Sequence, residues 1–323
     1  REQYIIKSDM SLFDCKKPGT FCNTIFKNYY KAFERPDWKT ITKKIKMSKA
    51  EQKIVTSIKL QKDSCNILDK KLTEYEKEKE YTKKFDNLIA SNYVNLLFKE
   101  YANKPLYERE RIYFKTNFDI IKNAKDLKRQ LIITTGDRNF SRNFQCSIYD
   151  IMDESGNTYI ICKSAEIKDG KLEDWKYAAF RFLYITDLRE ADKNDDLCIG
   201  EFDEMDIEDK IFYNGIQFFL DKPEIIKVRF TENGIKKYKS IRNLRPTEDY
   251  GWEEKDKEKK EAFLLKKKRD DKNNIKTFKC TRKQMEYYLF QFGSDAEILE
   301  PKDLREEFLK KYKDAVDAYS KTE

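Results

Sequence analysis

The spacing of apolar positions changes twice along the chain. In the first part, apolar residues recur every three or four positions, as in Phe21, Ile25 and Tyr29, which is typical of amphipathic helices. From Gln130 the spacing falls to about two, which indicates half-buried strands. Beyond Ile207 the two spacings alternate. The pattern therefore predicts an α+β fold with a helical first part, an all-β centre and a mixed last part.

The start of the chain predicts a strand followed by two helices. Gln3–Lys7 predicts a short strand, Met10–Lys17 a brief helix, and Phe21–Phe33 a longer helix capped by Thr20. Strand–helix–helix with a basic balance is the order of a ribbon-helix-helix module, a dimer that lays a two-stranded ribbon in the DNA major groove. The alternative is a set of lysine-rich helices whose charges only face solvent.

The centre predicts a small β-barrel. Turn signals such as Gly136-Asp137 and Asp169-Gly170 separate its candidate strands. The strands cover residues 131–135, 142–150, 158–165 and 179–188. Several short strands in so few residues favour a small barrel, because closure removes exposed strand edges.

The last part predicts a small α/β sandwich. Strands are expected at Ile225–Phe230, Lys276–Cys280 and Ala296–Leu299, and helices at Glu232–Ile241, Met285–Phe292 and Pro301–Tyr319. Gly293 suits the end of one helix and Pro301 the start of the next. Residues 253–274 are almost all charged and predict a mobile excursion. Three rings are expected on buried faces: Phe290, Phe292 and Phe308.

These elements divide the chain into four parts. Residues 1–46 form the ribbon-helix-helix-like module. Residues 47–128 form a helical linker, opened by the capping box Ser48–Glu51. Residues 129–192 form the β-barrel, and residues 193–323 form a C-terminal extension.

The positive charge lies at the start of the chain. The whole sequence carries 67 Lys and Arg against 59 Asp and Glu, a net charge of +8. Residues 1–60 hold 14 basic and 6 acidic side chains, so the remainder, with 53 of each, is neutral. Asp187–Lys210 holds 11 acidic and 3 basic side chains. A basic head would attract phosphate, whereas the acidic segment would avoid nucleic acid.

The seven cysteines and the absence of histidine restrict the chemistry. No C-x-x-C pair is present, so neither a zinc site nor a disulfide framework is expected. Without histidine there is no Ser-His or Cys-His catalytic arrangement. We expect reduced thiols in a cytoplasmic protein without metal or cofactor. No apolar run is long enough to span a membrane.

The central strands carry arginines among aromatic residues. Single-stranded nucleic acid is held by bases stacked on aromatic rings and by phosphate contacts. The candidate nucleic-acid-binding residues are Arg138, Phe140, Arg142, Tyr149, Tyr159, Arg181 and Tyr184. Each tyrosine has the alternative of a half-buried place in the barrel wall. For Arg181, binding and a structural salt bridge are both open.

Several of these residues belong to a resemblance with WYL-domain proteins. The tyrosines of Ile148-Tyr149 and Thr158-Tyr159-Ile160 stand where the family has Pro-Tyr and Trp-Tyr-Leu. Ala178–Ile185 keeps the Phe, Arg and Ile of the family's following strand. Tyr287–Arg305 resembles the WYL C-terminal extension, which commonly contributes to dimerisation. The resemblance implies a central β-barrel of the SH3/Sm type and a homodimer.

Other segments resemble a clostridial subfamily with an N-terminal ribbon-helix-helix. They are Phe21–Tyr30, Tyr101–Pro105 with the following Arg109-Glu110, and Ile226–Ile235 with the later Arg245-Pro246. Some members are accessory proteins of type VI-D CRISPR systems that bind single-stranded RNA and stimulate the RNA-guided ribonuclease. The resemblance implies single-stranded RNA as a partner, a CRISPR effector ribonuclease as another, and duplex DNA at the N-terminal module.

Together these observations predict a non-enzymatic nucleic-acid-binding regulator. The alternative is a dimeric DNA-binding transcription regulator whose barrel senses a nucleotide or nucleic-acid ligand. A nuclease would need metal ligands, for which the candidates are Asp203, Glu204, Asp206, Glu208 and Asp209. These acids follow one another on an acidic stretch without basic neighbours for a phosphate, which disfavours a hydrolase.

Overall fold

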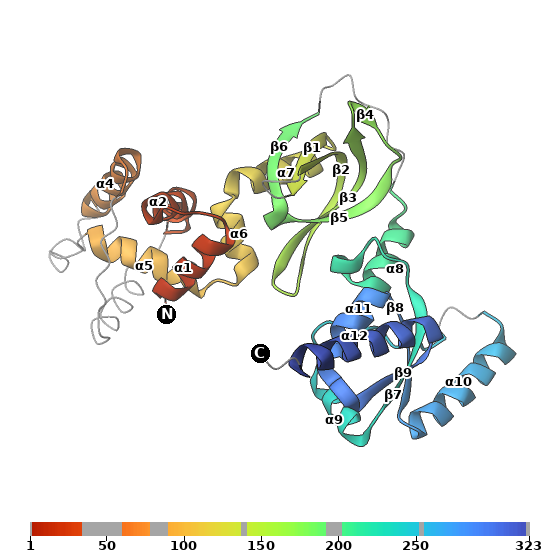
Figure 1. The fold of residues 1–323 in the computed structure, drawn as a ribbon. Helices are drawn as coiled ribbons and strands as arrows, with labels where there is room; N and C mark the ends of the chain where they lie inside the picture. The colour runs from red at the N-terminus through yellow and green to blue at the C-terminus, as the bar shows by residue number, and fades with distance from the viewer. Residues whose placement is uncertain are drawn as a thin grey trace. The chain divides into compact units, whose positions relative to one another are not determined.

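The computed structural model describes residues 2–33, 60–77, 90–136, 141–191, 202–251 and 255–320. The chain divides into two compact units, Arg1–Leu127 and Lys128–Glu323. Figure 1 labels the helices and strands of both. The four-part division expected from the sequence, with its boundaries after residues 46, 128 and 192, stays a prediction.

All regular structure described in the N-terminal unit is helical (Figure 1). Its helices are α1 (Glu2–Leu12), α2 (Pro18–Tyr29), the short η1 (Tyr30–Phe33), α4 (Lys62–Lys77), α5 (Ala90–Asn103), α6 (Leu106–Tyr113) and α7 (Lys115–Asp126). The strand expected at Gln3–Lys7 is wrong, because these residues lie in α1. The ribbon that a ribbon-helix-helix module requires is therefore absent from this stretch. The capping box Ser48–Glu51 lies outside the described residues.

A buried ion pair joins α1 to two other helices. Asp9 on α1 is 1% exposed, and Arg109 on α6 donates from Nε and Nη2 to its two carboxylate oxygens at 2.7 and 3.0 Å. Tyr101 on α5 donates its hydroxyl to the same carboxylate at 2.7 Å. Arg109 also donates to the carbonyl oxygen of Lys104. These contacts join three helices that are distant in sequence.

The second unit begins with a six-stranded antiparallel sheet. Its elements are β1 (Gln130–Gly136), β2 (Ser141–Glu154), β3 (Asn157–Lys168), β4 (Lys171–Leu172), β5 (Lys176–Arg181), the short η3 (Phe182–Tyr184) and β6 (Ile185–Glu190). The order is β4-β3-β2-β1-β6, and β5 also pairs with β3. Among the described residues the ladder does not close, although η3 leads directly from β5 into β6. A closed barrel is therefore not confirmed, and the sheet is curled and open (Figure 1).

The rest of this unit is a three-stranded antiparallel sheet with helices. The elements are α8 (Glu204–Asn214), η5 (Ile216–Phe218), β7 (Glu224–Phe230), α9 (Glu232–Ser240), α10 (Lys257–Lys272), β8 (Ile275–Cys280), α11 (Arg282–Leu289), η6 (Phe290–Asp295), β9 (Ala296–Glu300) and α12 (Lys302–Ser320). The strand order is β8-β7-β9. Its core includes Phe278, Tyr288 and Phe292. The described residues thus form an α+β fold, as predicted.

This region holds a helix that the sequence interpretation missed and a ring whose predicted burial is wrong. The charged stretch from 257 to 272 is the helix α10, begun by Asp256, whose side chain accepts the backbone N–H groups of Glu258 and Lys259. Phe292 and Phe308 are buried, but Phe290 is 44% exposed and its ring stacks on Tyr312 at 5.2 Å. A ring–ring contact at the surface thus replaces the burial expected for Phe290.

No described helix has the length and apolarity that crossing a bilayer requires.

Candidate nucleic-acid interface

The strand register separates the predicted binding residues onto two faces of the six-stranded sheet. Phe144 of β2 lies opposite Ile133 of β1, so these two side chains share one face of the sheet, which we call the first face. Arg142 lies two residues before Phe144 and points to the same face. Arg181 lies directly opposite Tyr159, on the second face. Arg142 and Arg181 therefore do not form one patch. Two further predicted residues, Arg138 and Phe140, lie outside the described residues.

Tyr159 and Tyr149 serve mainly as packing residues. Tyr159 is 7% exposed and packs in a cluster with residues of α8 and η5, including Ile207 and Ile216. Burial raises the pKa of its hydroxyl, against the opposing effect of the nearby positive charge of Arg181. Tyr149 is half-buried, and its ring lies 5.2 Å from that of Phe202. The ring of Tyr159 is therefore too buried to offer the free face that a stacked base needs.

Arg181 and Tyr184 form the accessible part of the predicted site. The guanidinium of Arg181 lies 5.0 Å from the centre of the Tyr184 ring, and its Nη1 donates to the Tyr184 hydroxyl at 3.2 Å. Tyr184 is 57% exposed, at the end of η3. The strand β5 and the tight turn η3 fix this pair at the rim of the sheet. A cation beside an exposed ring can contact both a phosphate and a base.

Arg142 belongs to a small cluster of opposite charges. Its Nε lies 3.9 Å from Glu166, and Lys168 lies 3.7 Å from Glu166 and 2.8 Å from Glu173. The hydrogen bond to Glu173 raises the pKa of Lys168. Two carboxylates among two cations leave little net positive charge here for a phosphate.

The basic head is mostly beyond what the structure describes. Of the 14 Lys and Arg side chains in residues 1–60, only five lie in residues 2–33: Lys7, Lys16, Lys17, Lys27 and Lys31. Of these, Lys27 forms an ion pair with Asp63 at 3.3 Å. The phosphate-binding interpretation of this head therefore stays a prediction.

Two of the five acids that a nuclease would use, Asp203 and Asp206, make structural contacts. Asp203 caps α8, since its carboxylate accepts the backbone N–H of Asp206 at 3.1 Å. Asp206 in turn forms an ion pair with Lys210, whose ammonium lies 5.0 Å from the ring of Tyr177. Within the described residues, no group of three potential metal-binding side chains comes together.

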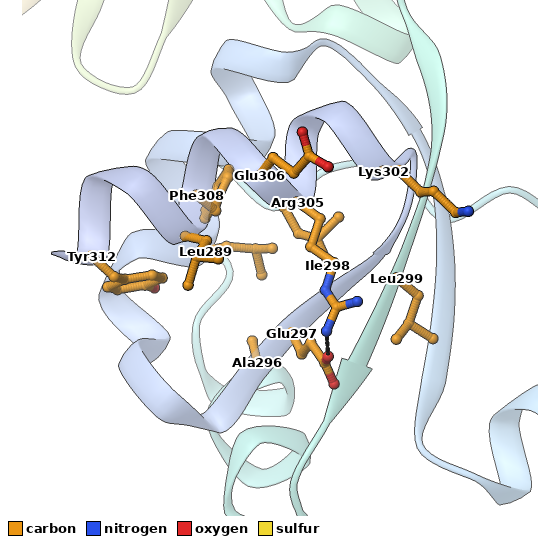
Figure 2. A pocket seen from close by; sticks show the side chains of 11 residues that line it. Leu289, Ala296, Glu297, Ile298, Leu299, Lys302, Arg305, Glu306, Phe308 and Tyr312 are labelled. Carbon is orange, nitrogen blue, oxygen red and sulfur yellow. Dashed lines mark hydrogen bonds and ion pairs between the residues drawn. The ribbon is translucent and has the colours of Figure 1, made fainter.

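The C-terminal sheet carries an open groove that the sequence did not predict. It has a volume of about 580 Å³ and runs between β9 and α12 (Figure 2). Ile298, Leu304 and Phe308 lie in the core beneath it. In Figure 2, Arg305 of α12 reaches across to Glu297 of β9, to which it is bonded at 2.5 Å. Within the described part of the chain, β9 pairs only with β7, so its other edge has no partner strand, and residues Ala296 to Leu299 of β9 line the groove.

Comparison with known proteins gives a likeness of fold. No protein-family model matches the sequence, and no curated protein matches it significantly. A solved structure described as "Crystal structure of a CRISPR Cas-related protein" is similar over 98% of this chain and 91% of that chain, with a TM-score of 0.61 and 19% identity. Another, "Proteasome accessory factor B/C (PafBC) of Arthrobacter aurescens", covers 72% of this chain and 32% of that chain, with a TM-score of 0.27 and 12% identity. The second likeness is too weak to support a conclusion.

Proposed function

We propose that this protein is a non-enzymatic regulator that binds single-stranded RNA at the rim formed by Arg181 and Tyr184. The observation that carries the proposal is the exposed tyrosine ring with a guanidinium 5.0 Å from its centre. The ring offers a stacking surface to any base, and the cation offers a contact to the neighbouring phosphate. The resemblance of this strand to that of WYL domains supports the same position.

The wider role we propose is that of an accessory protein to an RNA-targeting CRISPR ribonuclease of type VI-D. Two independent features support it. One is the resemblance of Phe21–Tyr30 and Tyr101–Pro105 to segments of accessory proteins of that type. The other is the similarity of fold, over 98% of this chain, to a protein described as CRISPR Cas-related. The competing role, a regulator that reads duplex DNA with an N-terminal ribbon, loses support because Gln3–Lys7 is helical.

Fluorescence anisotropy with single-stranded RNA, single-stranded DNA and duplex DNA at several salt concentrations tests the binding site. Loss of one stacking ring costs roughly 1–3 kcal/mol, so Tyr184→Ala should weaken RNA binding about 5- to 150-fold. Tyr184→Phe should retain affinity. Arg181→Ala should also reduce the salt dependence of binding. The slope of log K against log salt concentration should become shallower by about 0.7, because one phosphate contact is lost. The control is Tyr319→Ala, which removes a tyrosine that is 94% exposed on α12.

Two results would overturn the site. One is unchanged RNA affinity in both Tyr184→Ala and Arg181→Ala. The other is a preference for duplex DNA over single-stranded RNA in the full chain, which would favour the transcription regulator instead. Stimulation of ribonuclease activity, measured with and without this protein, tests the accessory role separately from binding.

The homodimer is a further part of the proposal, with the groove beside β9 as the contact surface for a second copy. Leu309 is 54% exposed beside this groove, and Val316 is 63% exposed two turns later on α12. Sedimentation equilibrium should give twice the monomer mass for the wild type and a monomer for Leu309→Asp. Leu265→Asp, which alters an exposed leucine of α10, is the matched control. A wild-type monomer, or an unaffected Leu309→Asp dimer, would contradict this surface.

A further inference from the structure

The helix α10 has a half-buried inner face and an exposed outer face. Its half-buried residues recur every three or four positions, as neighbours on one side of a helix do. They are Lys260, Phe263, Lys267 and Asp270. The last two turns of α10 also carry three exposed cations, Lys268, Arg269 and Lys272. Since one residue turns a helix by about 100°, these three lie within about 100° of one another, on the side opposite the inner face.

Contacts of the inner face hold α10 against the C-terminal sheet, where it meets β8. Lys267 donates to Oε2 of Glu248 at 3.0 Å, and its ammonium lies 4.5 Å from the centre of the Tyr250 ring. The side chains of Lys267 and Glu248 are 14% and 12% exposed, so this ion pair is largely shielded from water. Phe263 lies so close to Gly251 that a Cβ there would stand 2.7 Å from its ring. The outer face of α10 is therefore presented in a fixed orientation.

Neighbouring acids do not neutralise the three cations of the outer face. Within the part of the chain that the structure describes, their side chains form no hydrogen bond or ion pair. The acids next to them in sequence are placed elsewhere, since Asp271 forms an ion pair with Lys276 at 2.8 Å and Asp270 lies on the inner face. The exposed acids Glu258 and Glu261 lie in the first two turns. The end of α10 thus presents three positive charges to solvent.

The apolar residues of α10 decide which kind of anion suits this face. A helix that lies on a membrane buries a broad apolar face with large rings or leucines. In α10 the large exposed apolar side chains are only Leu264 and Leu265, and its one aromatic ring, Phe263, is on the inner face. A polyanion that needs no apolar partner fits better. The phosphates of a nucleic-acid strand supply such a row of charges.

We propose that Lys268, Arg269 and Lys272 bind the phosphate backbone of single-stranded RNA, as a contact separate from the ring of Tyr184. This inference rests on the RNA binding proposed above and adds a second surface to it. Phosphate contacts carry no base information, so this surface raises the affinity for every sequence. It requires no particular placement of α10 relative to Tyr184, because a flexible single strand links the two.

Fluorescence anisotropy of the full chain with labelled oligouridine, over a range of salt concentrations, tests the proposal. The triple variant Lys268→Gln, Arg269→Gln, Lys272→Gln should bind about tenfold or more weakly at low salt. Its slope of log K against log salt concentration should be shallower by about 2, at about 0.7 for each lost phosphate contact. Oligoadenosine should lose affinity by the same factor as oligouridine.

The matched control removes three exposed lysines of α9 and α12 and lowers the net charge by the same amount. It is the triple variant Lys236→Gln, Lys239→Gln, Lys310→Gln. The control should keep the wild-type affinity and slope, which separates a local contact from the overall charge. Cations near the end of a helix stabilise it by about 0.3–1 kcal/mol, so circular dichroism checks the folding of both variants. If the α10 triple variant melts early, Arg269→Gln alone should make the slope shallower by about 0.7.

Three results would overturn the assignment of this face while leaving RNA binding by the chain intact. One is an α10 variant with the affinity and slope of the wild type. Another is an equal loss in the control, which would show that only the overall charge matters. The third is binding to phosphatidylserine vesicles that depends on the three cations, together with unchanged RNA affinity, which would assign the face to a membrane. If the wild type binds no RNA at all, the proposed function itself fails and this inference falls with it.

Discussion

Replacing Arg109 by methionine tests the buried ion pair that holds the N-terminal unit together. The side chains of Asp9 and Arg109 are 1% and 11% exposed, so water compensates neither charge. Arg109→Met keeps most of the side-chain bulk but removes the two hydrogen bonds that Arg109 donates to the carboxylate, and only that from Tyr101 remains. Breaking one partner of a buried pair typically costs about 3–5 kcal/mol, because the other charge stays buried and uncompensated. We expect a loss of that size in the free energy of unfolding of this unit.

The double variant Asp9→Leu with Arg109→Met separates charge from packing. Replacing a buried pair by apolar residues of similar size is often neutral or stabilising. The double variant should therefore recover the stability that the single variant loses, less about 1–3 kcal/mol for the buried Tyr101 hydroxyl, which loses its acceptor when Asp9 is replaced. The control is Lys115→Met, which breaks an exposed pair with Asp119 at 2.8 Å and should cost less than about 1 kcal/mol.

Urea unfolding followed by circular dichroism measures the stability. Hydrogen exchange of peptides from α1, α5 and α6 assigns the change to this unit. If Arg109→Met costs no more than Lys115→Met, the ion pair does not stabilise the three-helix junction and the reasoning fails. If the double variant is as unstable as the single one, packing rather than charge carries the effect.

Two further predictions concern Asp295, in the turn before β9. Hydrogen bonds from Lys237, Thr231 and Asn233 lower the pKa of Asp295 to about 2. The ionised carboxylate therefore stabilises the fold above the usual carboxyl pKa of about 4, and this contribution is lost as the pH falls towards 2. Thermal melts between pH 5 and pH 2 should therefore show a smaller pH dependence in Asp295→Asn than in the wild type, and equal dependence would refute the assignment. Gly234→Ala should destabilise the unit by roughly 1–3 kcal/mol, because its Cβ would stand 2.1 Å from the carbonyl oxygen of Asp295; an unchanged melting temperature would show that the backbone yields without cost.

Tyr101–Pro105 and Arg109 carry part of the resemblance to the clostridial subfamily. Only the tertiary structure shows what these residues contact. Tyr101 and Arg109 both bond Asp9, and the carbonyl oxygen of Lys104 accepts from Arg109. The sequence marks this segment as distinctive but gives no sign that its partner is Asp9, about a hundred residues earlier. The same contact explains the wrong strand at Gln3–Lys7, since burial of Asp9 against two other helices outweighs a short alternation of apolar residues.

The missed helix α10 had a local signal. Its residues are mostly Lys, Glu, Ala and Leu, which favour helices, and Asp256 stands at the N-cap position. No residue of α10 is buried. The apolar stripe on which the sequence interpretation depended was therefore missing, and only propensity and capping remained to identify the helix.

Arg142 and Arg181 are separated by their positions along β3: Phe144, two residues after Arg142, lies opposite Glu166, whereas Arg181 lies opposite Tyr159. One irregularity further along β2 moves its later residues to the other face. A register shift between Ile148 and Asp150 displaces the pairing of β2 with β3 by one residue. Before the shift, even-numbered residues of β2 such as Phe144 point to the first face. After the shift, the even-numbered Met152 lies opposite Tyr159 and points to the second face. A slip of one residue exchanges the two faces of a strand. Alternation counted along the sequence therefore misplaces residues on one side of the shift.

The sequence by itself determined the order of helices and strands in most of the second unit, because apolar spacing is a local property of a strand or a helix. It also identified Arg181 and Tyr184 as candidates. Only the tertiary structure decided which candidates are accessible, since burial of Tyr159 depends on α8, more than forty residues later. It alone oriented α10, with Lys267 against Glu248 and the three cations of its outer face in solvent. These groupings depend on contacts between distant segments, which no local pattern records.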